Sequence, residues 1–278
     1  MWRAAGAVLA SAWLAGVLRG GEIVVAAASG FAGRPEAVEA ADALIGDLPG
    51  AVKAAFGNIG RGRAVATAGG GLPVIAALDR GGWSAVVPGR ADVSLPAGFL
   101  HRWRSGFRGA VMGAQWVSGD FRPAAFLVAE RGGLRLGIIA LGDPGVRSLA
   151  ERHREVSCRD EIEAVRDALK DPELAGCHGK VLLCRLPVAE FGVLDRLLVS
   201  VPEIDAVISA AGRGKIPGRM VRNRLCVQLG SGGAAVLKLH FDAGGRFRFA
   251  ESRLIGEKAP GGKPDGKQKR SETTDDGR

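Results

Sequence analysis

Short apolar runs alternate with segments of helical periodicity along most of this chain, and the alternation restricts its fold more than any other feature. Short apolar runs bounded by turn residues are typical of buried strands, and a 3.6-residue apolar period is typical of helices. Strands are predicted at residues 23–28, 64–68, 84–88, 109–117, 125–130, 134–141, 180–184, 206–209, 225–229 and 234–242. Helices are predicted at residues 35–45, 73–79, 160–170 and 191–199. The order predicts an α/β protein with mixed sheets packed between helices.

The helix predicted at residues 160–170 has the clearest local signals. Ser157 and Asp160 have the spacing of a capping box, and Ile162, Val165 and Leu169 form an apolar stripe. In open α/β sheets, ligands usually bind at the carboxyl ends of the strands. Functional residues are therefore expected directly after the predicted strands.

The two ends of the chain differ from its body. Arg3 precedes an apolar run at residues 4–18, which is shorter than the roughly 20 residues that a membrane-spanning helix needs. A buried amphipathic helix is the alternative, but the run has no polar face, so residues 1–21 are predicted to be a signal peptide for export, with a periplasmic location. Residues 256–278 have no apolar residue beyond Ala259 and are predicted to be a disordered tail. Residues 22–255 are then the folded domain, with no membrane span in the mature chain.

Composition excludes several classes of function. Lys and Arg outnumber Asp and Glu by 38 to 29, but the chain has no Tyr and only 5% aromatic residues. A protein that stacks nucleic-acid bases needs aromatic side chains among its basic ones, so no nucleic-acid partner is expected. Four cysteines without a CxxC pair are too few for a disulfide scaffold.

Four segments in the same order resemble the bacterial 5′-nucleotidase and UDP-sugar hydrolase family, which has the calcineurin-like metallophosphoesterase fold. The segment VPEIDAVISAAGR is similar to the family's "vPGIDvIigGHsH", and VQLGSGGAAVLKL is similar to "vqaGsyGkyvGrldl". Likewise, GWSAVVPGR resembles "GyDamtlGNHEfD", and LRLGIIALG resembles "vkiGviGlt". The resemblance covers about residues 22–254. It implies a four-layer sandwich of two mixed sheets flanked by helices, in a degenerate member of the family, with its UDP-sugar hydrolase-like (seleno)protein branch as a candidate.

Members of that family hold two divalent ions with Asp, His and Asn side chains at the strand ends. In this chain the matching positions hold residues that cannot ligate a metal: Gly30, Ala32, Gly70, Arg90, Ala91, Arg185, Ala211 and Arg213. The four histidines of the chain lie elsewhere. Two-metal hydrolysis needs the ions to activate water and to neutralise the developing charge. The resemblance therefore implies a pseudoenzyme without a metal site, a cofactor or catalytic residues.

Three of the lost ligands are arginines, namely Arg90, Arg185 and Arg213. If they surround one pocket, their guanidinium groups could bind a phosphate or carboxylate, which predicts a small anionic or phosphorylated ligand. The alternative is that each arginine pairs with a nearby acid such as Asp92 or Asp143, or points into water.

Cys184 is a second candidate, because it directly precedes Arg185 at a predicted strand end. A partly exposed thiol beside cations has a lowered pKa and is reactive, so Cys184 could be a redox nucleophile or pair with Cys158 or Cys177. Cys158 lies near a helix start, which also favours a thiolate. The alternative for Cys184 is a buried structural cysteine.

The sequence thus predicts a non-hydrolytic, 5′-nucleotidase-like periplasmic protein that binds a phosphorylated or acidic ligand. Two alternatives remain open. One is a thiol redox protein that uses Cys184, and the other is an active metal-dependent phosphoesterase or nucleotidase with ligands not yet assigned. The sequence identifies no protein partner.

Overall fold

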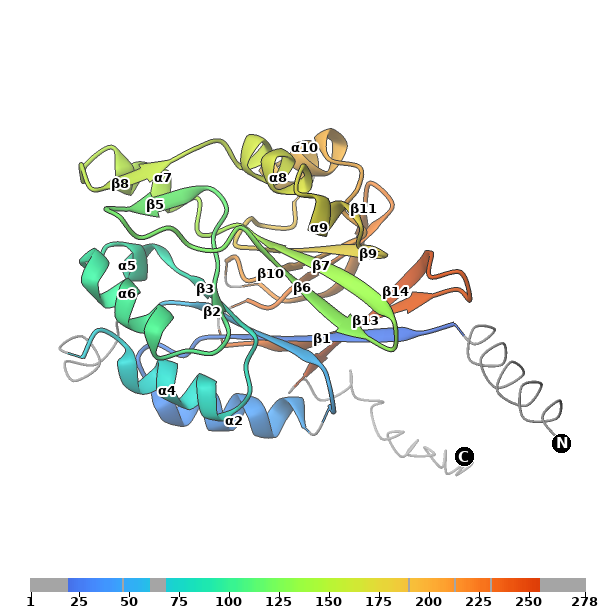
Figure 1. Ribbon diagram of the computed structural model, residues 1–278, viewed down its shortest axis with the longest axis horizontal. Coiled ribbons are helices and arrows are strands. Elements are labelled where there is room, and N and C mark those ends of the chain that lie inside the picture. The colour runs from blue at the N-terminus through green and yellow to red at the C-terminus, as the bar shows by residue number, and fades with distance from the viewer. Residues whose placement is uncertain are drawn as a thin grey trace, which may run out of the picture.

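Two mixed sheets form the centre of the protein (Figure 1). The computed structural model describes residues 20–46, 48–60, 69–189, 191–212, 214–230 and 232–255. Sheet 1 has the spatial order β14 (Phe247–Ile255), β13 (Ala234–Phe241), β1 (Glu22–Ser29), β2 (Val52–Gly57), β3 (Ala85–Pro88) and β4 (Ala110–Val111). Sheet 2 has the order β11 (Ile216–Val221), β12 (Arg224–Gln228), β10 (Ala206–Ser209), β9 (Gly179–Cys184), β7 (Leu134–Ala140) and β6 (Phe126–Arg131). A small third sheet pairs β5 (Trp116–Ser118) with β8 (Val156–Cys158).

Helices cover the outer faces of both sheets, which gives four layers (Figure 1). On sheet 1 lie α2 (Pro35–Ile45), α4 (Leu72–Arg80) and α6 (Ala97–Ser105), and on sheet 2 lie α8 (Glu161–Leu169), α9 (Pro172–Ala175) and α10 (Val193–Ser200). Two short helices, α5 (Arg90–Val93) and α7 (Gly145–Ala150), follow β3 and β7. Within the described ranges, no helix has the length and apolar character needed to cross a membrane.

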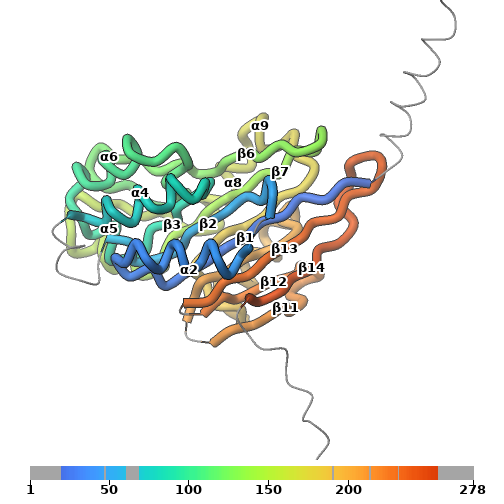
Figure 2. The backbone as a smooth tube through the Cα atoms, turned by 90° about the horizontal axis from the view of Figure 1, so that it is seen from below, coloured from blue at the N-terminus to red at the C-terminus, as the bar shows by residue number. Residues whose placement is uncertain are grey.

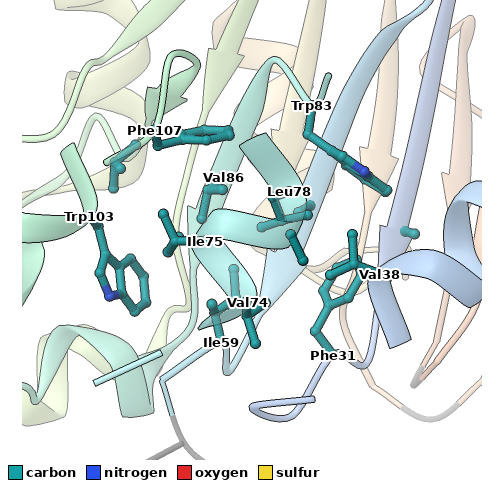
Figure 3. Close-up of a cluster of buried hydrophobic side chains, with 14 of the residues drawn as sticks. Phe31, Val38, Ile59, Val74, Ile75, Leu78, Trp83, Val86, Trp103 and Phe107 are labelled. Atoms are coloured by element: carbon teal, nitrogen blue, oxygen red, sulfur yellow. The ribbon is translucent and has the colours of Figure 1, made fainter. Parts of the chain in front are cut away.

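The core follows from the two-residue period of the strands. Along β1, Ile23 and Val25 face the cluster between the sheets, whereas Ala26 and Ala28 face the cluster under the helices. In the helix-side cluster, Ile75 and other side chains of α4 pack among aromatic rings (Figure 3). Such burial on both faces explains why the central strands are almost wholly apolar.

Parallel pairing brings the carboxyl ends of several strands together. β1, β2 and β3 run parallel in sheet 1, and β7, β9, β10 and β12 run parallel in sheet 2. At one side of the molecule the edge strands β14 and β11 meet (Figure 2), and the Ser252 Oγ donates a hydrogen bond to the Pro217 carbonyl at 2.6 Å. Residues at the carboxyl ends of β1 and β2 in sheet 1 and of β9 and β10 in sheet 2 line one cavity, so these strand ends lie next to each other.

The predicted α/β class and four-layer arrangement are confirmed, and α2 has the predicted bounds. The single strand predicted at 109–117 is wrong, because β4 and β5 belong to different sheets. Between them the chain crosses from sheet 1 to sheet 2, where the Ala114 amide donates to the Ala140 carbonyl at 2.8 Å. The strand predicted at 64–68 lies outside the described residues, and so do most of the predicted signal peptide and the predicted tail.

The predicted capping box before α8 is also wrong. Asp160 is itself the N-cap, and its carboxylate accepts hydrogen bonds from the amides of Ile162 at 2.9 Å and Glu163 at 3.2 Å. Ser157 lies in β8 instead. Asp160 therefore satisfies two free amides of the first helical turn by itself.

Candidate functional site at the strand ends

A cavity of about 160 Å³, which we call the central cavity, lies where the strand ends of the two sheets meet. Residues from both sheets line it: Ser29, Gly30, Ala32, Phe56, Gly57, Asn58, Arg185, Ala210, Gly212 and Gly230. Apart from Arg185, the lining is made of small, apolar or uncharged polar residues. Among the described residues, the cavity therefore has one cationic side chain, surrounded mostly by small residues.

Gly57 gives Arg185 access to the end of β2. Its φ of 101° is in the range that favours glycine, and a Cβ there would lie 2.7 Å from the Arg185 Nη1. A Cβ on Gly89, just after β3, would lie 3.2 Å from the same nitrogen. The guanidinium group of Arg185 thus starts from sheet 2 and reaches the strand ends of sheet 1.

Arg185 is mostly buried, with 19% of its side chain exposed, and Asp143 is the acid beside it. The Arg185 Nε lies 3.2 Å from the Asp143 Oδ2, but it makes no hydrogen bond of good geometry with any described residue. Asp143 is one of the two acids named above as possible partners of these arginines. Arg185 and Asp143 therefore form a close ion pair in which the Nε hydrogen of Arg185 has no hydrogen-bond acceptor among the described residues.

Two buried polar side chains hold the loop that follows Arg185. The Ser209 Oγ donates to the Leu186 carbonyl at 2.5 Å, and the Gln228 Oε1 accepts from the Val188 amide at 2.9 Å. The Gln228 amide nitrogen in turn donates to the Gly214 carbonyl at 2.7 Å. The sequence analysis missed these positioning residues, although a polar residue at the end of an apolar strand was the available signal.

Asp92, in α5, fixes the backbone on the sheet 1 side of the site. Its carboxylate has no exposed surface and accepts hydrogen bonds from the amides of Gly60 at 2.7 Å and Gly89 at 2.9 Å. Burial raises the pKa of Asp92 to about 6, although these hydrogen bonds and the charge of Arg185 act in the opposite direction. Asp92 thereby ties the loop after β2 to the start of α5.

Arg90, the first residue of α5, faces a second and larger cavity of about 600 Å³, which we call the basic cavity. It is lined by Asn58, Arg90, Ala91, Ser94, Asp143, Leu149, Arg152 and His153. Arg90 and Arg185 therefore do not line one pocket, but they line two cavities that share Asn58. Arg213 lies outside the described residues.

The predicted reactivity of Cys184 is contradicted by its surroundings. The side chain has no exposed surface, and burial raises the pKa of the Cys184 thiol to about 12. Burial and the nearby charge of Glu161 also raise the pKa of Cys158, opposite to the predicted direction. All four cysteines are free, so Cys184 forms no disulfide with Cys158 or Cys177. The buried structural cysteine is the interpretation that fits.

Gly70, one of the positions matched to a metal ligand, is not among the residues that line the central cavity. Gly70 lies in the turn before α4, where its carbonyl accepts a hydrogen bond from the Trp103 indole. The strand beside β1 is β2, and the residue after its last residue is Asn58. Asn58 therefore occupies a strand-end position and contributes an amide oxygen, a group that can ligate hard cations.

The other residues at these strand ends do not fit a dinuclear metal site. Gly30, Ala32, Ala91 and Ala211 have no ligating side chain, and Arg90 and Arg185 bring positive charge. The carboxylate of Asp92 is engaged by backbone amides, and that of Asp143 by Arg185. Across the described part of the chain, no three His, Cys, Asp or Glu residues are grouped so that they could hold a metal ion.

Solved structures share this architecture, whereas neither a protein-family model nor a curated protein sequence matches the chain. The calcineurin-like phosphoesterase YfkN from Bacillus subtilis superposes with a TM-score of 0.69 over 85% of this chain and 90% of that one. This chain has the calcineurin-like phosphoesterase fold. The sequence identity to YfkN is 13%, so the likeness concerns the fold alone.

Two 5′-nucleotidases show the same likeness. A 5′-nucleotidase precursor from Thermus thermophilus is 19% identical, with a TM-score of 0.68 over 84% of this chain and 54% of that one. A putative 5′-nucleotidase from Staphylococcus aureus, in complex with α-ketoglutarate, is 14% identical, with a TM-score of 0.66 over 86% of this chain and 55% of that one. The chain therefore spans about half the length of these two proteins. The predicted resemblance is confirmed at the level of the fold.

Proposed function

We propose that this chain is a non-hydrolytic, 5′-nucleotidase-like protein of the periplasm that has lost the dinuclear metal site and binds a small phosphorylated or acidic ligand. The observation that carries the proposal is the position of Arg185. Its guanidinium group lies against Gly57 and Gly89, at the strand ends where the resemblance places the metal ions. A fixed cation there favours an anion and disfavours a divalent cation.

The charges around the central cavity support an anionic ligand. Arg185 is paired with one carboxylate, that of Asp143, and Arg90 brings a further positive charge nearby. A mostly buried guanidinium group with unsatisfied donors gains most from a charged acceptor. Phosphate and carboxylate groups also match the planar fork of an arginine.

Binding of inorganic phosphate and sulfate to the full chain tests this function. We expect millimolar phosphate to raise the melting temperature, since a ligand that binds only the folded state stabilises it. Arg185→Gln should weaken phosphate binding at least ~10-fold. Arg185→Lys keeps the charge but loses the planar guanidinium group, so its affinity for phosphate should lie between those of the wild type and Arg185→Gln. Circular dichroism checks that both variants fold. If phosphate, sulfate and nucleotides all leave the melting temperature of the wild type unchanged, the proposal is wrong.

The proposed location rests on residues 1–21. Their basic start and apolar run support cleavage and export. Mass spectrometry of the protein purified from a cell fraction gives the mature N-terminus. A chain that still begins at Met1 in the cytoplasmic fraction would contradict export and leave the binding proposal untouched.

Within the described part of the chain, only the amide oxygen of Asn58 supports the alternative of an active metal-dependent phosphoesterase. No feature of the described cysteines favours a thiol redox function, because Cys184 is buried and its pKa is raised. Binding without turnover is therefore the function that the geometry favours.

A further inference from the structure

The central and basic cavities both have Asn58 in their lining. The proposed function places an anionic group in the central cavity and leaves the basic cavity without a role. We infer that the ligand carries two anionic groups, as a bisphosphorylated or polyphosphorylated compound does, and that Arg90 and Arg152 bind the second group in the basic cavity. This inference rests on the proposed function, because it assigns the first anionic group to Arg185.

Two guanidinium groups face the basic cavity without an acidic partner among the described residues. Arg152 donates its Nε hydrogen to the Ser148 carbonyl at 3.0 Å, which anchors the side chain but uses neither terminal nitrogen. Arg90 lies across the start of α7, where its Cδ is 2.9 Å from the position of a Cβ on Gly145. Both side chains are exposed, and of the two only Arg152 is anchored by a hydrogen bond to backbone, so their terminal donors are available to a ligand in the cavity.

The acid that lines the basic cavity does not compensate these charges. Asp143 pairs with Arg185, and its Oδ1 accepts the Gly145 amide at 2.8 Å. Arg90 and Arg152 thus leave the described lining of the cavity with excess positive charge. An anion between the two guanidinium groups would relieve their repulsion and accept their hydrogen bonds.

The lining of the basic cavity also indicates what kind of group it accepts. No Phe, Tyr or Trp is among its lining residues, so a nucleobase would find no aromatic ring to stack on. The remaining contacts come from small polar and aliphatic side chains such as Ser94 and Leu149. These features favour a second phosphate over an aromatic substituent.

Asn58 joins the two cavities into one binding surface. Its side chain is exposed and lines both, at the end of β2. The central cavity has a volume of about 160 Å³ against about 600 Å³ for the basic cavity. A ligand anchored on Arg185 by one anionic group therefore extends past Asn58 into the larger space.

Calorimetric titrations with inorganic phosphate, pyrophosphate and tripolyphosphate test the inference. At about 0.15 M salt, where distant charges are screened, we expect pyrophosphate or tripolyphosphate to bind at least ~10-fold more tightly than phosphate. Arg152→Ala should abolish this gain, so that pyrophosphate and tripolyphosphate bind no more tightly than phosphate does. Arg154→Ala is the matched control, because it removes the same charge from the same segment but lines neither cavity.

The possible results distinguish a ligand without a second anionic group from a protein that binds no anion at all. Equal affinities for phosphate and the longer probes would overturn the second anionic group and leave the proposed function in place. Equal losses in Arg152→Ala and Arg154→Ala would also overturn it, since the gain would then come from general charge. Absence of binding by any of the three probes would overturn the proposed function together with this inference.

Discussion

At the scale of single residues, Asp92 is the acid whose protonation matters most for the candidate site. It has no exposed surface, and its carboxylate holds the amides of Gly60 and Gly89. In the folded protein its pKa is about 6, compared with 3.8 in the absence of its surroundings. The folded state therefore binds more protons than the unfolded state between these two pH values.

This difference predicts the direction of a pH dependence. The stabilisation connected with neutral Asp92 is fully present below about pH 3.8 and is lost as the pH rises through about 6. From pH 3.8 to 7.5, the free energy of unfolding should fall by about 3 kcal/mol more in the wild type than in Asp92→Asn, which does not titrate. Urea denaturation of both proteins across this range measures the difference. Parallel pH profiles would show that folding leaves the pKa of Asp92 unchanged and would contradict the prediction.

Cys184 gives a second prediction for a single residue. Because burial raises its pKa to about 12, almost no thiolate exists at pH 8, and the side chain is also covered. Iodoacetamide at pH 8 should modify Cys184 at least ~100-fold more slowly in the native protein than in urea, with half-buried Cys158 reacting first. Peptide mass spectrometry follows both sites. Rapid native modification of Cys184 would restore the redox alternative.

Some of the site could be predicted from individual residues. Arg185 directly follows an apolar strand, so its place at the end of β9 follows from the local pattern. Its pairing with Asp143 depends instead on the packing of two loops that are distant in sequence. Asn58 was not predicted as a site residue, because β2, the strand directly before it, was not predicted.

At the scale of elements, a strand could be predicted where its own residues show that it is buried. β7 and β9 are rich in Leu, Ile and Val and could be predicted closely. β2 reads VKAAFG, and its alanines and lysine favour a helix as readily as a strand. It is a strand because β1 and β3 flank it on both sides. α5 and α7 are too short to show helical periodicity.

Gly89, between β3 and α5, gives a prediction at this scale. Its φ of −84° suits any residue, but an added Cβ would lie 2.5 Å from the Asn58 Oδ1 and 3.2 Å from the Arg185 Nη1. Gly89→Ala should therefore displace both side chains, weaken phosphate binding at least ~10-fold and cost about 1–3 kcal/mol of stability. Calorimetry and urea denaturation measure the two effects.

Gly98→Ala, in α6, is the matched control. A Cβ there meets no atom within 4 Å, and alanine is the better helix former. This variant should bind phosphate like the wild type and be up to about 1 kcal/mol more stable. If Gly89→Ala also bound phosphate like the wild type, phosphate would not bind at the strand ends beside Gly89.

At the scale of the whole molecule, the packing of the two sheets places Arg185, which follows β9 in sheet 2, beside the strand ends of sheet 1. The four-layer arrangement could be predicted from the order of segments that resemble the phosphoesterases, and solved structures confirm that fold. The two adjoining cavities could not, because residues from β2, α5, α7 and the β9 loop meet only in the folded protein. In the folded protein, Arg90 and Arg152 of the basic cavity therefore lie near the ion pair between Arg185 and Asp143.

The most direct test of this account is the metal content of the purified full chain, produced with Mn²⁺ and Zn²⁺ in the medium and assayed for phosphodiesterase and 5′-nucleotidase activity with Mn²⁺ added. The account predicts metal well below one ion per chain and no turnover. One or two ions per chain together with turnover would contradict it.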